Sequence, residues 1–164
     1  MLFLVIAAVI IVVFALKAVV VVPNGKAYIV ERMGVYVATL HPGFHVLMPL
    51  LDKIRYKHST AVQTQELSEV VETRDRQQAS VASTYRFRIL DPQRASYGAA
   101  DYASFLRELV RTSQKRYVAG QTWDALRQDS RSFEAEVQRA VDEAAESVGL
   151  KLVEYSVKDM QPQG

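Results

Sequence analysis

Residues 80–92 read SVASTYRFRILDP, and this stretch decides how the rest of the chain is interpreted. Every second residue from Val81 to Ile89 falls on one face of an extended chain, while Arg86 and Arg88 fall on the other. Asp91-Pro92 ends the pattern, because proline has no N–H to donate to a sheet. The segment therefore predicts a β-strand, at the point where the chain changes from strands to helices.

Strand patterns precede this segment, and helix patterns follow it. Upstream, short stretches typical of strands cover residues 26–32, 35–40, 52–58 and 61–72. Downstream, residue types favoured at helix N-caps begin three predicted helices: Asp101 for 102–118, Thr122 for a short helix to Arg127, and Asp129 or Ser130 for 131–148. Residues 151–159 alternate again. Strands, then helices, then a returning strand predict an α+β fold.

The N-terminal segment, residues 1–22, is apolar except for Lys17. A helix over residues 2–22 would be roughly 32 Å long, enough to span a bilayer. Its Leu, Ile, Val and Phe side chains would gain about 5–10 kcal/mol on insertion, against a cost of about 3 kcal/mol for Lys17. We expect a single transmembrane anchor. A cleaved signal peptide and a buried core helix are the alternatives, and Val19–Val22 also suits a strand.

Charge is distributed unevenly around this anchor. The net charge is +2, but residues 23–60 alone carry five basic and two acidic side chains. Lys17, Lys26 and Arg32 flank the C-terminal side of the apolar run, so the positive-inside rule predicts a cytoplasmic body, as for a single-pass protein of a bacterial inner membrane. Acidic and basic residues are intermixed elsewhere, so we expect no nucleic-acid partner. One apolar run excludes a polytopic transporter, and zero cysteines exclude a disulfide-stapled scaffold.

Residues 41–51, HPGFHVLMPLL, are predicted to be an irregular and unusually apolar loop, because two prolines and a glycine exclude a helix or central strand. Close to the anchor, such a loop is interpreted as a second contact with the bilayer, made by Phe44, Val46, Leu47, Met48, Leu50 and Leu51. Ordinary core packing is the alternative. The bases that follow are candidates for anionic lipid: Lys53, Arg55 and Lys57. Their alternation also fits one face of a strand.

Catalytic, metal and cofactor signatures are weak. His41 and His45 have the spacing of a zinc pair on a helix, but Pro42-Gly43 lies between them. The sequence contains no G-x-S-x-G elbow, no S-x-x-K and no phosphate-binding glycine loop. We therefore predict no catalytic, cofactor-binding or metal-binding residues, and no cofactor.

Several short motifs follow one another along the chain. They are Val22-Pro23-Asn24-Gly25, then VERMGVY at 30–36, LHPGFH at 40–45, PLLDKI at 49–54, YRFRILDP at 85–92, VGLKL at 148–152 and VKDMQP at 157–162. Taken together, just after an apolar anchor, they resemble the stomatin/prohibitin/flotillin (SPFH, or band 7) family, and most closely its stomatin-like slipin branch.

The resemblance implies a transmembrane helix followed by an SPFH domain with a twisted, mostly antiparallel sheet and packed helices. The expected segments are an anchor at 1–22, a membrane-proximal β-rich subdomain at 23–95, an α/β subdomain at 96–160, and at 161–164 the start of a coiled-coil region that is missing or absent. It also implies homo-oligomeric rings or cages, a scaffold that organises lipid microdomains or regulates a partner membrane protease, and no catalytic residues.

The helical half is expected to supply lateral contacts between subunits. Its candidate residues are Arg107, Arg111, Glu134 and Glu143. Two other functions stay open: a monomeric lipid- or sterol-binding membrane module and, less favoured, a membrane-bound hydrolase.

Overall fold

The structure, a computed structural model, describes residues 1–163. Its internal contacts divide the chain after Thr60 into unit 1, Met1–Thr60, and unit 2, which begins at Ala61. The sequence analysis placed its subdomain boundary between residues 95 and 96 instead. The two differ because the strand Gln78–Ile89 hydrogen-bonds directly to the C-terminal strand, the strand Gln63–Glu72 pairs with Gln78–Ile89, and all three share one core.

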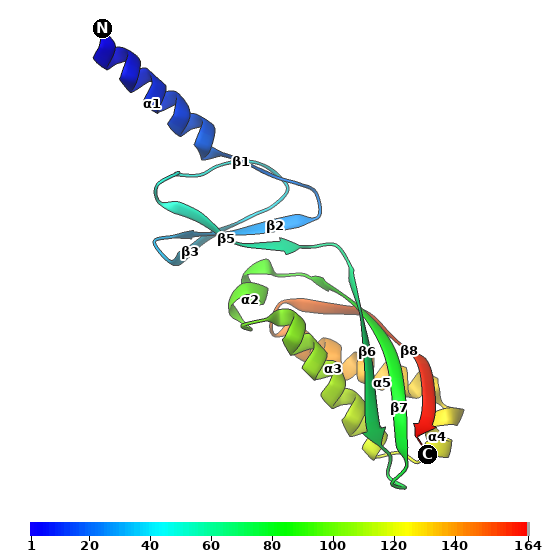
Figure 1. The fold of residues 1–164 in the computed structure, drawn as a ribbon. Helices are drawn as coiled ribbons and strands as arrows, with labels where there is room; N and C mark the ends of the chain where they lie inside the picture. The colour runs from blue at the N-terminus through cyan, green and yellow to red at the C-terminus, as the bar shows by residue number, and fades with distance from the viewer. Residues whose placement is uncertain (164) are drawn as a thin grey trace. The chain divides into compact units, whose positions relative to one another are not determined.

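Unit 1 contains one helix and five short strands. They are α1 (Leu2–Ala18), β1 (Val19–Val22), β2 (Lys26–Arg32), β3 (Val35–Leu40), β4 (Gly43–Val46) and β5 (Asp52–Ser59). All pairings are antiparallel, in a three-stranded sheet of order β3-β2-β5 and a two-stranded ribbon of β1 and β4 (Figure 1). Both contribute to a small core of Val22, Tyr28, Val30 and Leu40.

Unit 1 differs from the sequence-based expectations in the segment 41–51 and in the length of its N-terminal helix. The segment 41–51 was expected to be irregular throughout, and this is wrong for Gly43–Val46, which pair with β1. Pro42 and Pro49 lie outside these four residues, so neither removes a hydrogen bond from the ribbon. The other expectation, a transmembrane helix over residues 2–22, is not confirmed. The helix α1 ends at Ala18, and Val19–Val22 form β1. Within residues 1–163, no helix combines the length and the apolar character required to cross a membrane.

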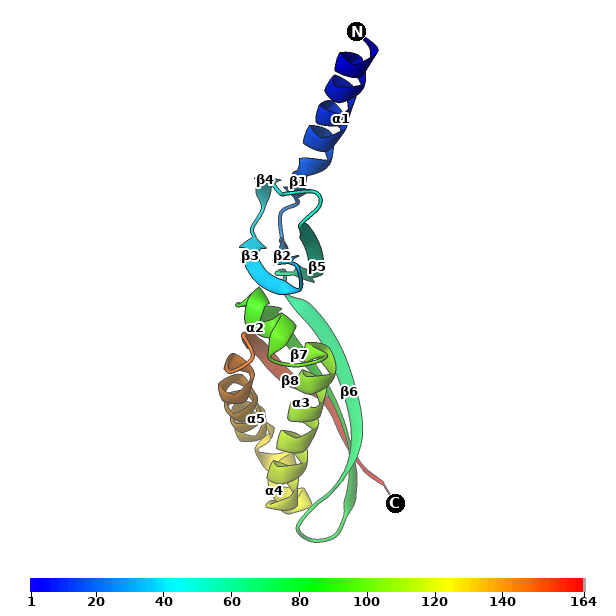
Figure 2. The same ribbon diagram turned by 90° about the vertical axis from the view of Figure 1, so that its left-hand side faces the viewer.

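Unit 2 is a three-stranded antiparallel sheet with helices on one face. Its strands are β6 (Gln63–Glu72), β7 (Gln78–Ile89) and β8 (Leu150–Gln163), with β7 in the centre. Its helices are α2 (Pro92–Tyr97), α3 (Tyr102–Ala119), α4 (Trp123–Gln128) and α5 (Ser130–Glu146). Helices α3 and α5 run along the same face of the sheet (Figures 1 and 2). The predicted α+β class with antiparallel strands is confirmed.

The core of unit 2 follows the pattern of its central strand. Val81, Ser83, Tyr85, Phe87 and Ile89 of β7 are all buried, as the alternation predicts. A polar network lies inside this core: Gln114 Nε2 donates to Ser83 Oγ and to Tyr155 Oη, each at 2.7 Å. Burial raises the pKa of Tyr155 to about 12. These hydrogen bonds fix α3 against β7 and β8 at one relative position.

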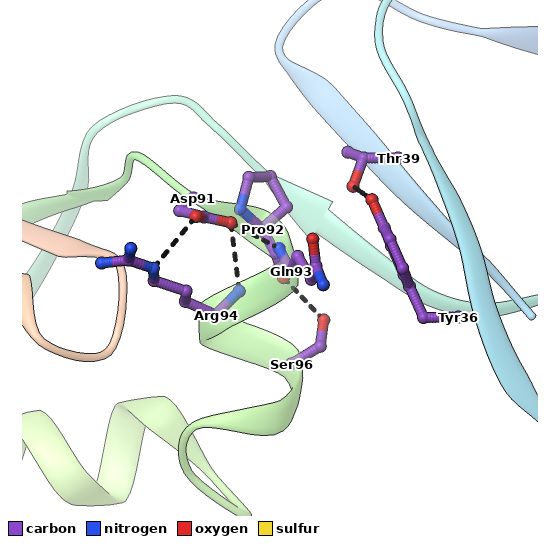
Figure 3. A network of polar contacts seen from close by, with 7 residues as sticks. All are labelled: Tyr36, Thr39, Asp91, Pro92, Gln93, Arg94 and Ser96. Atoms are coloured by element: carbon purple, nitrogen blue, oxygen red, sulfur yellow. Dashed lines mark hydrogen bonds and ion pairs between the residues drawn. The ribbon is translucent and has the colours of Figure 1, made fainter.

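The helix starts are set by capping side chains. Asp101, Thr122 and Asp129 accept backbone N–H groups of α3, α4 and α5, so the predicted N-caps are confirmed. The sequence analysis missed α2, where Asp91 Oδ1 accepts from the N–H groups of Gln93 and Arg94 at 3.0 and 3.1 Å (Figure 3). Pro92 is the first residue of this helix, a position that tolerates proline, so Asp91-Pro92 both ends β7 and begins α2.

Candidate membrane-contact site

The ribbon of β1 and β4 has one exposed apolar face. Its register places Val19 opposite Val46 and Val21 opposite Phe44. All four side chains are exposed, with Phe44 at 83% and Val46 at 80% of their full accessible surface. Cross-strand partners lie on the same face of a ribbon, so these side chains form one contiguous apolar surface directly after α1. An exposed apolar surface of this kind marks a contact with a protein, a ligand or a membrane.

Leu47 lies differently from its neighbours. Its side chain packs against the core of unit 1, and its N–H donates to the carbonyl of Ala18 at 2.8 Å. It therefore joins the predicted bilayer-contacting segment to the end of α1. Met48, Leu50 and Leu51, by contrast, have exposed side chains. Of the six residues predicted to contact the membrane, five are exposed, and Leu47 has a packing role.

The turn at residues 48–51 is held in place by Asp52. This carboxylate accepts from Arg32 Nε at 2.7 Å and Nη2 at 3.2 Å, and from the N–H of Met48 at 2.9 Å. The Arg32 guanidinium, followed by the Met48 N–H, lowers the pKa of Asp52. Arg32 and Asp52 also face each other in the pairing of β2 with β5. The apolar turn is thus fixed to the end of the three-stranded sheet.

A hollow of about 630 Å³ lies beside this turn. It is lined by Glu31, Met33, Gly34, Leu50, Leu51, Lys53, Arg55 and Tyr56. Met33, at the β2–β3 turn, is 86% exposed and has a φ of +54°, a conformation that costs about 1–2 kcal/mol for a residue with a side chain. The sequence analysis did not select Met33. Its signal was a large apolar residue next to Gly34 between two predicted strands.

The three basic candidates do not share a face. Lys57 lies opposite Tyr28 and Lys53 lies opposite Glu31, with a bulge between them that leaves Arg55 without a paired residue on β2. Tyr28 and Glu31 are on opposite faces of β2, so Lys53 and Lys57 are too. Lys57 Nζ lies 5.2 Å from the centre of the Tyr28 ring. Lys53 and Arg55 line the hollow beside Leu50 and Leu51, whereas Lys57 does not.

The residues predicted to contact neighbouring subunits lie in unit 2. Arg111 Nε is 3.1 Å from Glu69 Oε2, and Glu134 Oε1 accepts the N–H of Val157 at 2.7 Å. Arg107 hydrogen-bonds to Tyr85, whose pKa is nevertheless raised, mainly by burial. Glu143 lines a groove of about 490 Å³ between α3 and α5, together with residues such as Arg116 and Arg139. Arg111 and Glu134 thus have contacts within the chain, and their role between subunits stays a prediction.

One histidine side chain of the segment 41–51, that of His45, has a local hydrogen-bond partner. His45 Nε2 lies 2.7 Å from the carbonyl oxygen of His41 and donates to it. That nitrogen carries a proton and has no lone pair for a metal. In the described part of the chain, no cluster of three or more His, Cys, Asp or Glu side chains could hold a metal ion.

Comparison with known proteins agrees with the sequence motifs. Residues 20–164 match the model of a family described as SPFH domain / Band 7 family. The chain is 32% identical over 142 residues to "Stomatin-like protein 2, mitochondrial" of Rattus norvegicus, covering 85% of this chain and 40% of that protein. The Homo sapiens protein of the same name is 32% identical, with 85% and 39% covered. "Stomatin-like protein stl-1" of Caenorhabditis elegans is 28% identical, with 85% and 44% covered. The chain thus spans about 40% of the length of these relatives.

Proposed function

The chain belongs to the SPFH domain / band 7 family, stomatin-like branch, and from this premise we propose that it is a membrane-attached scaffold protein without catalytic activity. The apolar N-terminal segment is the anchor. The exposed face of β1 and β4 and the turn at residues 48–51 form the second bilayer contact.

One observation carries this proposal: the apolar face formed by Val19, Val21, Phe44 and Val46 is exposed and continues directly from α1. Transfer of apolar surface from water gains about 25 cal/mol per Å². A bilayer interface next to the anchor would cover this face without any partner protein. Lys53 and Arg55 would then meet lipid headgroups, where each base contributes about 1 kcal/mol on an anionic leaflet.

Spin labels test the bilayer contact directly, since the chain has no cysteine and each introduced cysteine is a unique labelling site. Labels at Phe44→Cys and Val46→Cys in nanodisc-embedded protein should be accessible to oxygen and shielded from a polar relaxation agent. Leu90→Cys, an exposed apolar position of unit 2, is the matched control and should show the opposite pattern. Equal, water-like accessibility at all three positions would exclude the second contact.

Orientation follows from the charges near the anchor. We place the body on the cytoplasmic side of a bacterial inner membrane, because Lys17, Lys26 and Arg32 flank the C-terminal end of the apolar run. A cysteine at the exposed Lys115 should react with a membrane-impermeant reagent in inside-out vesicles and stay unlabelled in intact cells. Labelling in intact cells would show that the body lies on the opposite side of the membrane.

Assembly is the second part of the proposal. Subunits would form a ring or cage through the helical half of unit 2, organise the surrounding lipid and regulate a partner membrane protease. The mass of the nanodisc-embedded particle tests this, because a ring or cage of many subunits has a much larger mass than a monomer. The hollow beside Leu50, Leu51, Lys53 and Arg55 favours one other function, a monomeric lipid-binding module. A monomer with one copurified lipid per chain would support that alternative.

A further inference from the structure

The two edges of the unit 2 sheet are built differently. Strand β8 has two bulges in its pairing with β7, one at Val153 and one at Lys158. Helix α5 contributes a carboxylate beside each bulge: Asp142 Oδ1 accepts the N–H of Leu152 at 3.1 Å, and Glu134 Oε1 accepts the N–H of Val157 at 2.7 Å. Bulges and side-chain hydrogen bonds of this kind prevent another strand from pairing with an edge. The β8 edge is therefore protected.

Strand β6, at the opposite edge, has no such protection. Its ten residues pair with β7 without a bulge, and it contains neither proline nor glycine. Among residues 1–163, no strand pairs with its other side, and Figure 2 shows β6 along the margin of the sheet. A long, regular edge strand presents a row of alternating N–H and C=O groups, which is a template for strand addition.

The outward face of β6 indicates which strand would pair there. Residues 64, 66, 68, 70 and 72 alternate with the residues packed against the helices, and all five are exposed. Glu66 and Glu72 lie on this face, on either side of the exposed Val70, and β6 carries no basic residue. Lys158 pairs with Glu66, but both side chains are more than half exposed, and such pairs contribute only about 0–1 kcal/mol. A basic side chain on an added strand could displace Lys158.

A second copy of this chain is a poor occupant. In an antiparallel pairing centred on position 69, its β6 would bring Glu66 of each copy against Glu72 of the other, and like charges on neighbouring strands are destabilising. Its β8 edge has the N–H groups of Leu152 and Val157 already bonded to α5. We propose that the β6 edge binds an extended, basic segment of a partner protein by strand addition, with Lys or Arg side chains opposite Glu66 and Glu72. This interaction surface is independent of the proposed bilayer contact in unit 1.

Amide hydrogen exchange on the full chain in detergent micelles tests the proposal, with a short capped peptide of alternating Lys and Thr as the probe. In an edge strand, alternate amides point away from the sheet. On peptide binding, alternate amides between Thr64 and Glu72 should exchange about tenfold more slowly, the effect of roughly one added hydrogen bond each. The matched Glu–Thr peptide should leave them unchanged.

Charge reversal provides the matched variants. Glu66→Lys/Glu72→Lys should abolish the protection by the Lys–Thr peptide and allow protection by the Glu–Thr peptide, while β7 amides report that the sheet stays folded. Asp124→Lys/Glu146→Lys makes the same charge change on exposed helix positions and should behave as wild type. Three outcomes would overturn the proposal: binding without slower exchange on alternate β6 amides, equal protection by both peptides, or peptide-free protection that falls on dilution, which would identify a second copy as the occupant.

Discussion

Asp52 joins the apolar turn at residues 48–51 to the β2–β5 sheet through Arg32 and the Met48 N–H. Because its pKa is lowered in the folded state, its contribution to stability is complete above its unfolded pKa of about 4 and is lost as the pH falls through the lower folded pKa. Asp52→Asn should therefore be less stable than wild type at neutral pH, and the difference should shrink in acid. Thermal unfolding across this pH range measures it. A difference that is constant with pH would show that the charge does not hold the turn.

Tyr155 should make the stability of the fold depend on pH in the alkaline range. Its folded pKa is raised to about 12 by burial, so its neutral form stabilises the fold below an unfolded pKa of about 10, and this contribution is lost between pH 10 and 12. The linked loss is about 2–3 kcal/mol in the free energy of unfolding. Tyr155→Phe should cost about 1–3 kcal/mol at neutral pH, because Gln114 Nε2 loses a buried acceptor. In denaturant titrations, the free energy of unfolding of the variant should also fall less steeply above pH 10 than that of wild type. An equally steep fall in the free energy of unfolding for wild type and variant above pH 10 would contradict this.

For single residues, contacts with the next few residues could be predicted from the sequence, whereas contacts with distant strands could not. Asp101, Thr122 and Asp129 cap their helices because capping depends on bonds to the next two or three residues. Lys53 and Lys57 were treated as one face, but the bulge at Arg55 separates them. That bulge depends on the pairing with β2, which has no local sequence signal.

The contact between β8 and α5 should stabilise strand β8 along its length. Glu134 and Asp142 lie on one side of α5 and bind β8 at its two bulges. Glu134→Ala should destabilise unit 2 by about 1–3 kcal/mol, because a half-buried N–H loses its charged acceptor. Glu134→Gln keeps an oxygen acceptor and should recover part of that loss. Exchange of the Val157 amide should rise in the alanine variant and much less in the glutamine variant. Unchanged exchange in both variants would show that Glu134 does not hold β8 at this bulge.

Elements with a long periodic pattern were predictable, and short ones were not. β7 and the helices α3 and α5 have enough residues for their period to be read from the sequence. β4 has four residues and α2 has six, so neither repeats its period. β4 exists only because β1 lies beside it, and the apolar segment around it was therefore interpreted as a loop.

Over the whole molecule, the two units have very different cores. Unit 2 has a large core in which the sheet packs against α3, α4 and α5. The hydrophobic cluster of unit 1 contains Val22, Tyr28, Val30 and Leu40, and Ala27 and Ile29 are its only other fully buried apolar residues among those described. Stability rises with the apolar area buried, so unit 1 should have the lower free energy of unfolding. The unit with the candidate bilayer contact is thus also expected to be the less stable one.

This difference gives a test that links stability to function. A ligand that binds only the folded state stabilises it by RT ln(1 + [L]/Kd), so a bilayer that covers the face of Phe44 and Val46 should stabilise unit 1 alone. On transfer from micelles of a neutral detergent to nanodiscs, amides of β2 and β5 should exchange about tenfold or more slowly, whereas those of β7 should be unchanged; a tenfold change corresponds to about 1.4 kcal/mol. Phe44→Asp/Val46→Asp should reduce this slowing without altering exchange in β7. If both units are slowed equally, or if the double variant is slowed as much as wild type, the ribbon face does not contact the membrane.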